Sequence, residues 1–190
     1  MLTALITSLA LVCLAEMGDK TQLLTLMLSV RYGRPLPLIA GIFLATLLNH
    51  AGTGAVGYWL RASLNPEWMR WGLAVSFFAV AVWILIPDTA DEDTLTDDAG
   101  TANILWVTTW LFFMAEMGDK TQVATLAMAA RFHDVVAVVV GSTLGMLAAN
   151  VPVVYLGNAM ASRLPLNAIR MVTALILAMM GMATLLWPGV

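Results

Sequence analysis

Charged side chains are scarce in this sequence, and their scarcity excludes most classes of soluble protein. Asp, Glu, Lys and Arg together make up 11% of the 190 residues, and apolar residues make up 61%. An ordinary soluble domain carries about 25% charged residues. A soluble globule of this composition would expose large apolar patches and associate. The composition therefore indicates a protein of the lipid bilayer.

Cysteine and clustered basic residues are also scarce. Cys13 is the only cysteine, so an intramolecular disulfide is impossible. No block of Lys and Arg indicates a nucleic-acid partner. The formal net charge is −3, and half of the twelve acidic residues fall in one short stretch, at Asp88, Asp91, Glu92, Asp93, Asp97 and Asp98. The remaining charged residues are therefore few, and their positions are the main evidence in the sequence for a functional site.

Six apolar stretches are long enough to cross a bilayer, which takes about 20 residues. They lie at 2–30, 36–60, 68–87, 103–130, 135–158 and 166–187. Short polar segments separate them, except at 88–102, which is acidic, has almost no large apolar residue and is predicted to be a flexible aqueous linker. The sequence thus predicts an all-α integral membrane protein with six transmembrane helices.

The chain repeats itself at an offset of 100 residues. The segment AEMGDKTQ at 15–22 recurs unchanged at 115–122, and the register continues at Thr25 and Thr125, Gly41 and Gly141, and Arg70 and Arg170. We therefore expect two homologous three-helix repeats, 1–87 and 103–190, joined by the linker. An odd number of helices in each repeat inverts the second repeat in the membrane. In transporters built this way, the substrate site lies near the midplane where the repeats meet.

Each copy of the motif places two carboxylates near the middle of an apolar stretch. An Asp or Lys at the centre of a membrane helix costs at least about 2.5 to 3.5 kcal/mol, so these groups must meet each other, water or an ion. Glu16 and Asp19 are three residues apart, which places them on one face of a continuous helix. Inverted symmetry would bring Glu116 and Asp119 against them, so the sequence predicts one shared carboxylate site.

The charge and chemistry of this site favour a hard divalent cation. Four carboxylates and two lysines sum to a charge that one divalent cation neutralises and an anion worsens. Carboxylate, amide and hydroxyl oxygens suit Mg²⁺, Ca²⁺ or Mn²⁺ better than zinc or copper. The predicted metal ligands are Glu16, Asp19, Gln22, Glu116, Asp119 and Gln122, with Lys20, Thr21, Lys120 and Thr121 supporting them.

Two alternatives concern the same motif. Met17 and Met117 could add soft thioether ligands and shift the preference toward manganese, although each falls about 100° round the helix from its neighbouring glutamate. The charged residues could instead form structural ion pairs, Glu16 with Lys20 and the same pair in the second copy. Buried ion pairs are often no more stable than apolar packing, which weakens this alternative.

Glycine and asparagine residues near the motif have two interpretations each. Gly18 and Gly118 cost roughly 1 kcal/mol relative to Ala inside a helix. They either allow close helix packing or let the helix bend so that carbonyl groups face the ion.

Asn49 and Asn150 lie in the second helix of each repeat, about one residue out of register. They could supply amide oxygens to the site or hydrogen bonds between helices.

The doubled motif resembles that of the membrane family of bacterial manganese exporters and Golgi manganese/calcium-proton antiporters. Both copies fit the family pattern E-x-G-D-[KR]-[TS], from Glu16 to Thr21 and from Glu116 to Thr121. The resemblance covers nearly the whole chain. It implies export of manganese, or of calcium in some members, in exchange for protons, with the motif acids as ligands. It also implies a bacterial member located in the inner membrane.

We therefore expect a transporter rather than an enzyme, with no prosthetic group and with a divalent cation, protons and lipid as its partners. A carboxylate that binds a metal also binds protons, so the two compete for one site and exchange follows. The expected activity is export of Mn²⁺ from the cytoplasm by a cation/proton antiporter. The alternatives are a Ca²⁺/H⁺ antiporter with the same site, a divalent cation channel and, further away, an intramembrane protease that uses paired acids.

Overall fold

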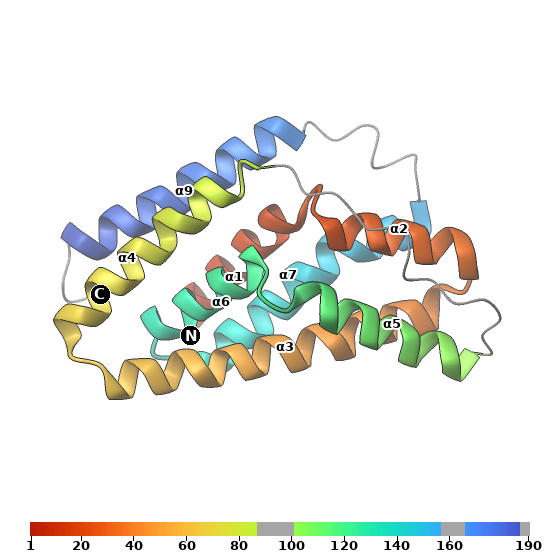
Figure 1. Cartoon of the computed structure of the whole chain (residues 1–190), viewed down its shortest axis with the longest axis horizontal. Helices are drawn as coiled ribbons and strands as arrows, with labels where there is room; N and C mark the ends of the chain where they lie inside the picture. Colours follow the sequence, from red (N-terminus) through yellow and green to blue (C-terminus); the bar gives the residue numbers. More distant parts are fainter. Residues whose placement is uncertain (87–100, 157–165, 187–190) are drawn as a thin grey trace.

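The computed structural model describes residues 1–86, 101–156 and 166–186, and within these ranges the chain is helical and contains no strand (Figure 1). The helices are α1 (Leu2–Glu16), α2 (Lys20–Tyr32), α3 (Pro35–Ser63), α4 (Pro66–Trp83), α5 (Thr101–Glu116), α6 (Lys120–Arg131), α7 (Val135–Leu156) and α9 (Leu166–Leu186). The prediction of an all-α protein is confirmed for these residues. The linker predicted at 88–102 lies outside the described residues except for its last two positions.

The first apolar stretch forms a bent pair of helices. α1 ends at Glu16 and α2 begins at Lys20, and the two helix axes differ in direction by 70°. Gly18 in this break has φ 76°, and Gly118 between α5 and α6 has φ 72°, a left-handed conformation that glycine adopts readily. Of the two interpretations of these glycines, the structure shows the bend, and the prediction that backbone carbonyl groups face an ion there stays a prediction. The expectation of one continuous helical face carrying Glu16 and Asp19 is wrong, because the break separates them.

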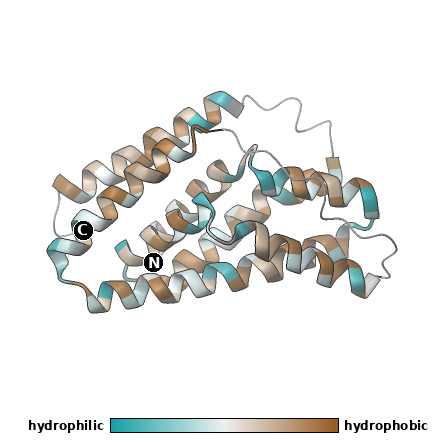
Figure 2. Ribbon diagram, in the orientation of Figure 1, coloured by the Kyte–Doolittle hydropathy of each residue, from teal (hydrophilic) through white to brown (hydrophobic). Residues whose placement is uncertain are grey.

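Three of the described helices are long and apolar enough to cross a membrane, namely α3, α7 and residues Asn167–Leu186 of α9. The bent pair α1–α2 makes a fourth candidate span if it crosses as one unit. Large apolar side chains such as Trp59 and Trp106 are more than half exposed on the outside of the helices, and Figure 2 shows hydrophilic residues gathered at the bends and helix ends. A lipid environment accounts for this distribution.

The helices of the two halves pack against each other in an exchanged arrangement. α1 packs along α7, and α5 packs along α3 (Figure 1). Gly141 of α7 meets the carbonyl oxygen of Leu5, and a Cβ at Gly41 of α3 would lie 2.9 Å from the carbonyl oxygen of Leu105. These two contacts are related by the 100-residue offset of the sequence. Glycine is required at both positions because the neighbouring backbone occupies the space of a side chain.

The bent pair α1–α2 and α7 run in the same direction. The contact of Gly141 with Leu5 lies near the start of both segments. Toward their ends, the Ser29 hydroxyl donates a 2.7 Å hydrogen bond to the Val154 carbonyl oxygen. α7 therefore follows the whole bent pair, across its break, and provides it with a continuous partner.

α3 and α7 run in opposite directions. Nδ1 of His50 lies 3.4 Å from Oγ1 of Thr143, and four residues later in α3, Gly54 approaches Val139, which precedes Thr143 in α7. The sequence repeat makes α3 and α7 equivalent elements of the two halves. Two equivalent helices of the chain are thus antiparallel.

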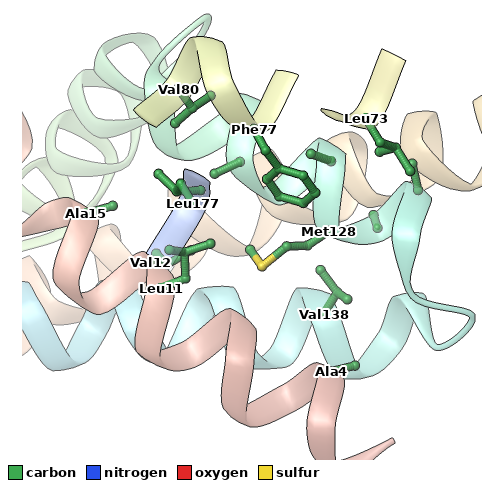
Figure 3. Close-up of a cluster of buried hydrophobic side chains, with 14 of the residues drawn as sticks. Ala4, Leu11, Val12, Ala15, Leu73, Phe77, Val80, Met128, Val138 and Leu177 are labelled. Carbon is green, nitrogen blue, oxygen red and sulfur yellow. The ribbon is translucent and has the colours of Figure 1, made fainter. Parts of the chain in front are cut away.

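The apolar interior consists of two clusters. The larger one includes side chains of α1, α4, α6, α7 and α9, and Figure 3 shows Val12, Phe77, Met128 and Leu177 within it. The smaller one joins α2, α3, α5 and α7 around Phe112. Among the described residues, α4 and α9 contribute buried side chains only to the larger cluster. The α4–α9 pair therefore packs on one side of the helices that carry the motifs.

Candidate metal-binding site

The first bend places two acidic residues in the interior. Glu16 is the last residue of α1 and Asp19 is the N-cap of α2, and their side chains are 0% and 1% exposed. The Asp19 amide donates to the Glu16 carbonyl oxygen at 3.0 Å, and the Gly18 amide donates to Oε1 of Gln22 at 2.8 Å. The motif thus forms its own turn, and both carboxylates leave that turn toward the interior.

The second bend has the same internal hydrogen bonds. The Asp119 amide donates to the Glu116 carbonyl oxygen at 3.2 Å, and the Gly118 amide donates to Oε1 of Gln122 at 2.7 Å. The Glu116 and Asp119 side chains are buried as well. Identical sequences therefore produce the same local turn twice, and the repeat observed in the sequence persists in the backbone.

Crossed ion pairs join the two motifs. Nζ of Lys20 lies 3.1 Å from Oδ1 of Asp119, and Nζ of Lys120 lies 2.7 Å from Oδ1 of Asp19. Each lysine thus neutralises an aspartate of the other copy. The Glu16 carboxylate lies within electrostatic range of Asp19 and of both acids of the second motif. The structure therefore brings the four carboxylates and two lysines of the predicted site together.

The two glutamates have carboxylate oxygens that no described residue satisfies. Neither side-chain oxygen of Glu16 accepts a hydrogen bond of good geometry among the described residues, although the Asn150 side chain lies close to this carboxylate, and Oε1 of Glu116 has no partner among them. The structural pair of Glu16 with Lys20 considered above is therefore not formed. Buried carboxylate oxygens without partners are costly, so these atoms call for a bound cation or a proton. Both glutamates therefore have acceptor capacity that a cation or a proton could use.

Threonine makes the two motifs different in detail. The Thr121 hydroxyl lies 3.3 Å from Oε2 of Glu116 and 3.1 Å from Oδ2 of Asp119, and it bridges the two acids of its motif. The equivalent Thr21 hydroxyl is buried and has no hydrogen-bond partner among the described residues. The predicted supporting role of these threonines has a structural counterpart in the second motif only.

The glutamines contribute to the turns. In addition to accepting from Gly18, Gln22 donates from Nε2 to the Ala149 carbonyl oxygen of α7 at 3.1 Å. Its amide therefore links the first bend to α7, the helix that runs alongside the bent pair. Gln122 accepts from Gly118 in the same way. The role of either glutamine as a metal ligand stays a prediction, and each would use the remaining lone pair of an oxygen that already accepts one bond.

The two predicted asparagines occupy different environments. Asn150 lies beside the Glu16 carboxylate, and its Oδ1 accepts a 2.6 Å hydrogen bond from the Thr25 hydroxyl. Asn49 donates from Nδ2 to the Phe113 carbonyl oxygen at 3.2 Å. Both side chains thus connect helices of different halves. Their participation in metal binding stays a prediction, and Asn150 is the better placed of the two.

A pocket of about 370 Å³ lies beside the second bend, between α3, α5 and α6. Asn49, Met117 and Gln122 contribute to its lining together with apolar side chains. Met117 is 56% exposed there, so its thioether points away from the buried acids. The pocket makes the second bend the more accessible of the two from outside the helix bundle.

The acids are not arranged as a finished coordination shell. In the described ranges, no three His, Cys, Asp or Glu side chains are grouped closely enough to hold one metal ion. The reason is visible in the crossed pairs, since the lysine ammonium groups of Lys20 and Lys120 lie against the aspartates. This arrangement is the one expected when lysines, rather than a metal, neutralise the aspartates.

Two features of this site were not predicted from the sequence. One is the crossing of the lysines, which depends on how the two halves approach each other. The other is Arg170 of α9, whose Nη2 atom donates to the Gly18 carbonyl oxygen at 3.1 Å. The sequence did single out Arg170, because an arginine also stands 100 residues earlier, at Arg70. Its contact with the motif could not be derived from spacing alone.

Comparison with known proteins gives two matches that cover both motifs. The family model described as "Divalent cation/proton antiporter GDT1" matches residues 4–92 and 104–188. A protein of Vibrio cholerae serotype O1 named "Putative manganese exporter" is 47% identical over 184 residues, which cover 96% of this chain and 90% of that protein. No solved structure matches the chain. Both bends and all four buried acids lie inside the matched ranges.

Proposed function

The chain belongs to the GDT1 family of divalent cation/proton antiporters, and from this premise we propose that it exports Mn²⁺ from the cytoplasm in exchange for protons. It is a multi-pass membrane protein that transports cations, as its family and its apolar helices establish. The name of the Vibrio cholerae relative supports Mn²⁺ as the cation. The observation that carries the proposal is the meeting of two acidic motifs in the buried centre of the molecule.

The proposed architecture is six transmembrane spans in two inverted repeats, 1–87 and 103–190, with 88–102 as the linker. The antiparallel course of the equivalent helices α3 and α7 supports the inversion. The exchanged packing of α1 with α7 and of α5 with α3 supports a pseudo-two-fold relation between the halves. Because the bends interrupt the first span of each repeat near its middle, the carboxylates would lie near the bilayer midplane.

In the proposed site, Glu16, Asp19, Glu116 and Asp119 are the ligands of the transported cation. Gln22, Gln122 and the other residues around the bends hold these acids in place. The four carboxylates and two lysines carry a net charge of −2, which either one divalent cation or two protons would neutralise. A buried charge is tolerated only when it is compensated. Exchange of one Mn²⁺ for two protons would therefore keep the site neutral in both loaded states.

The lysines have a defined part in this exchange. In the described arrangement Lys20 and Lys120 neutralise Asp119 and Asp19. A cation that binds the glutamates and aspartates together would displace the two ammonium groups from direct contact with the aspartate oxygens. Both lysines would stay beside the site, because the metal-loaded site is neutral only when their charges are counted. The release of the cation lets the lysines return. The crossed pairs thus keep the aspartates compensated while the site has no metal.

Proteoliposome transport tests this proposal. Purified protein is reconstituted, a pH step is imposed, and the uptake of Mn²⁺, Ca²⁺, Mg²⁺ and Zn²⁺ is compared. We expect Mn²⁺ to move against its own gradient when the proton gradient drives it, with matching proton movement in the opposite direction. The Glu16→Gln/Glu116→Gln double variant is the control. Flux that only runs down the cation gradient would identify a channel and contradict the proposal.

Calcium is the second candidate cargo. The oxygen donors that converge on the site, carboxylates and amides, are those that Ca²⁺ prefers. Met117, which would favour manganese as a soft ligand, is exposed at the pocket and turned away from the acids. Proton-driven uptake of Ca²⁺ that exceeds uptake of Mn²⁺ at equal concentrations would replace manganese with calcium in the proposal.

A further inference from the structure

Arg170 of α9 contacts the first bend from outside the motif. Its Nη2 atom donates to the carbonyl oxygen of Gly18 at 3.1 Å. The amide of the same peptide group, that of Asp19, donates to the Glu16 carbonyl oxygen at 3.0 Å. Arg170 thus holds the peptide group that connects the two acids of the first motif, and it does so with a charged donor, which makes a stronger hydrogen bond than a neutral one.

Arg70 is the equivalent of Arg170 in the first half, at the 100-residue offset. Its Nε atom is buried and has no hydrogen-bond partner among the described residues, and its guanidinium lies 6.0 Å from the centre of the Trp71 ring. Gly118, the equivalent of Gly18, is exposed, and nothing lies within 4 Å of a Cβ added to it. Within the described residues, the second bend therefore has no arginine contact.

The packing of α4 and α9 explains this difference. α9 packs against α1, and α4 packs against α6. The sequence repeat makes α9 equivalent to α4, α1 to α5, and α6 to α2. In the described residues, α4 does not pack substantially against α5, and α9 does not pack substantially against α2. Leu177 of α9 and Val12 of α1 lie in the larger apolar cluster (Figure 3), whereas Phe112, the equivalent of Val12, lies in the other cluster, apart from Phe77. The sequence repeat defines a second, equivalent position for the pair, against α5 and α2.

We propose that Arg170 and Arg70 are positioning residues that hold the two bends alternately. This inference rests on the proposed function, since it describes how the same site is exposed to each side of the membrane. In the present state Arg170 binds the Gly18 carbonyl oxygen and the second bend is open at its pocket. When the α4–α9 pair moves to pack against α5 and α2, Arg70 binds the Gly118 carbonyl oxygen and Arg170 releases Gly18. Each arginine stabilises one access state.

The informative variant is Arg70→Gln, because Arg70 has no contact with either bend in the present state. Arg70→Gln and Arg170→Gln are each expected to lower the maximal Mn²⁺ transport rate about tenfold, the effect of losing one hydrogen bond to a charged group. The KM for Mn²⁺ measured from the two sides of the membrane should shift in opposite directions, because each substitution changes the fraction of protein in each access state while neither arginine is a metal ligand. Lysine at either position should restore part of the rate, because it keeps the charged donor.

Arg61→Gln is the matched control, since Arg61 is also half-buried near a helix end but pairs with His133, away from the motifs. It should transport at the wild-type rate. Wild-type transport by Arg70→Gln would overturn the proposal, because it would show that only the arginine contact of the present state matters. A rise in KM on both sides of the membrane in either arginine variant would also overturn it, since the residue would then act on metal binding.

Crosslinking tests the two positions without any transport measurement. In a Cys13→Ser background, Val12→Cys/Leu177→Cys reports the present packing, and Phe77→Cys/Phe112→Cys reports the equivalent packing. Treatment of membranes with a short thiol crosslinker should link the first pair less and the second pair more when Arg170→Gln is added, and the reverse when Arg70→Gln is added. If neither yield shifts, the alternating contact is refuted. If the yields shift but wild-type protein moves no Mn²⁺, the proposed function alone fails.

Discussion

The first bend, between α1 and α2, and the second bend, between α5 and α6, share one sequence and one set of internal hydrogen bonds. Their surroundings differ. The first bend is held by Arg170 and linked through Gln22 to α7. At the second bend Gly118 is exposed, Met117 lines a pocket, and Thr121 bridges the two acids. The turn is therefore a property of the motif, and its accessibility is a property of the packing around it.

This comparison suggests how a chain that carries the same motif in both halves can distinguish the two sides of a membrane. The two motifs have the same sequence and the same turn, so they do not by themselves determine which side of the membrane the site faces. The α4–α9 pair packs on one side only and breaks the symmetry. In our proposal, exposure of the site to either side depends on a movement of this pair.

The largest expected effect concerns the crossed lysines. Lys120 is 2% exposed and lies against Asp19, whereas Lys20 is 31% exposed against Asp119. Lys120→Met should destabilise the protein by about 3–5 kcal/mol, because it removes one partner of a buried ion pair. Lys20→Met should cost about 1 kcal/mol or less, as expected for a partly solvated pair. Thermal unfolding in detergent measures both, and Lys120→Arg is the control. Equal losses of stability from the two substitutions would contradict the difference in burial between the two lysines.

The next effect concerns the acids, which should respond equally although the bends differ. Glu16→Gln and Glu116→Gln are each expected to lower the initial rate of Mn²⁺ transport about 100-fold or more, since even the partners of metal ligands commonly contribute 10- to 100-fold. Asp19→Asn and Asp119→Asn should behave alike. The exposed Glu67 provides the control Glu67→Gln. A folded Glu16→Gln protein that transports at the wild-type rate would remove this residue from the site.

The glycines of the bends should show a smaller effect. Alanine at Gly18 or Gly118 must adopt φ near 76° or 72°, which costs about 1–2 kcal/mol. Gly33, with φ 58° at the end of α2 and open space around it, is the matched control. Gly33→Ala should lower the stability by a similar amount and leave transport intact, whereas Gly118→Ala should also slow transport. If Gly118→Ala and Gly33→Ala transport equally well, the bend tolerates the change and its geometry is not critical.

The smallest effect is expected for the methionines. Met17→Leu and Met117→Leu conserve volume and should change the transport rate less than about twofold. The ratio of Mn²⁺ to Ca²⁺ transport should also stay constant, because neither thioether binds the cation in our proposal. Competition between the two ions in proteoliposomes measures this ratio. A marked loss of manganese preference in Met117→Leu alone would show that a thioether reaches the cation from the second bend.

The sequence was sufficient for the parts of this structure that depend on composition and repetition. Long apolar stretches predicted the helices, and the repeated motif predicted that four carboxylates would gather. The break at Gly18 was only one of two open interpretations, because a glycine in an apolar stretch is compatible with close packing as well as with bending. The structure decides between the two, because Gly18 lies in a turn that hydrogen bonds within the motif close.

The asymmetry of the site could not be predicted from the sequence. Two identical motifs, compared as strings, predict identical environments, so Thr21 and Thr121 or Gly18 and Gly118 are indistinguishable. One difference in their surroundings is the α4–α9 pair, which packs against α1 and α6. The pairing of Lys20 with Asp119, rather than with an acid of its own motif, likewise depends on the approach of the two halves in space.

The exchange of partners between the halves has a consequence for assembly. Because α1 packs on α7 and α5 on α3, and because each lysine compensates an aspartate of the other half, neither half is complete alone. We expect that residues 1–87 and 103–190, produced as separate polypeptides, are degraded when expressed singly and are recovered together as a non-covalent heterodimer.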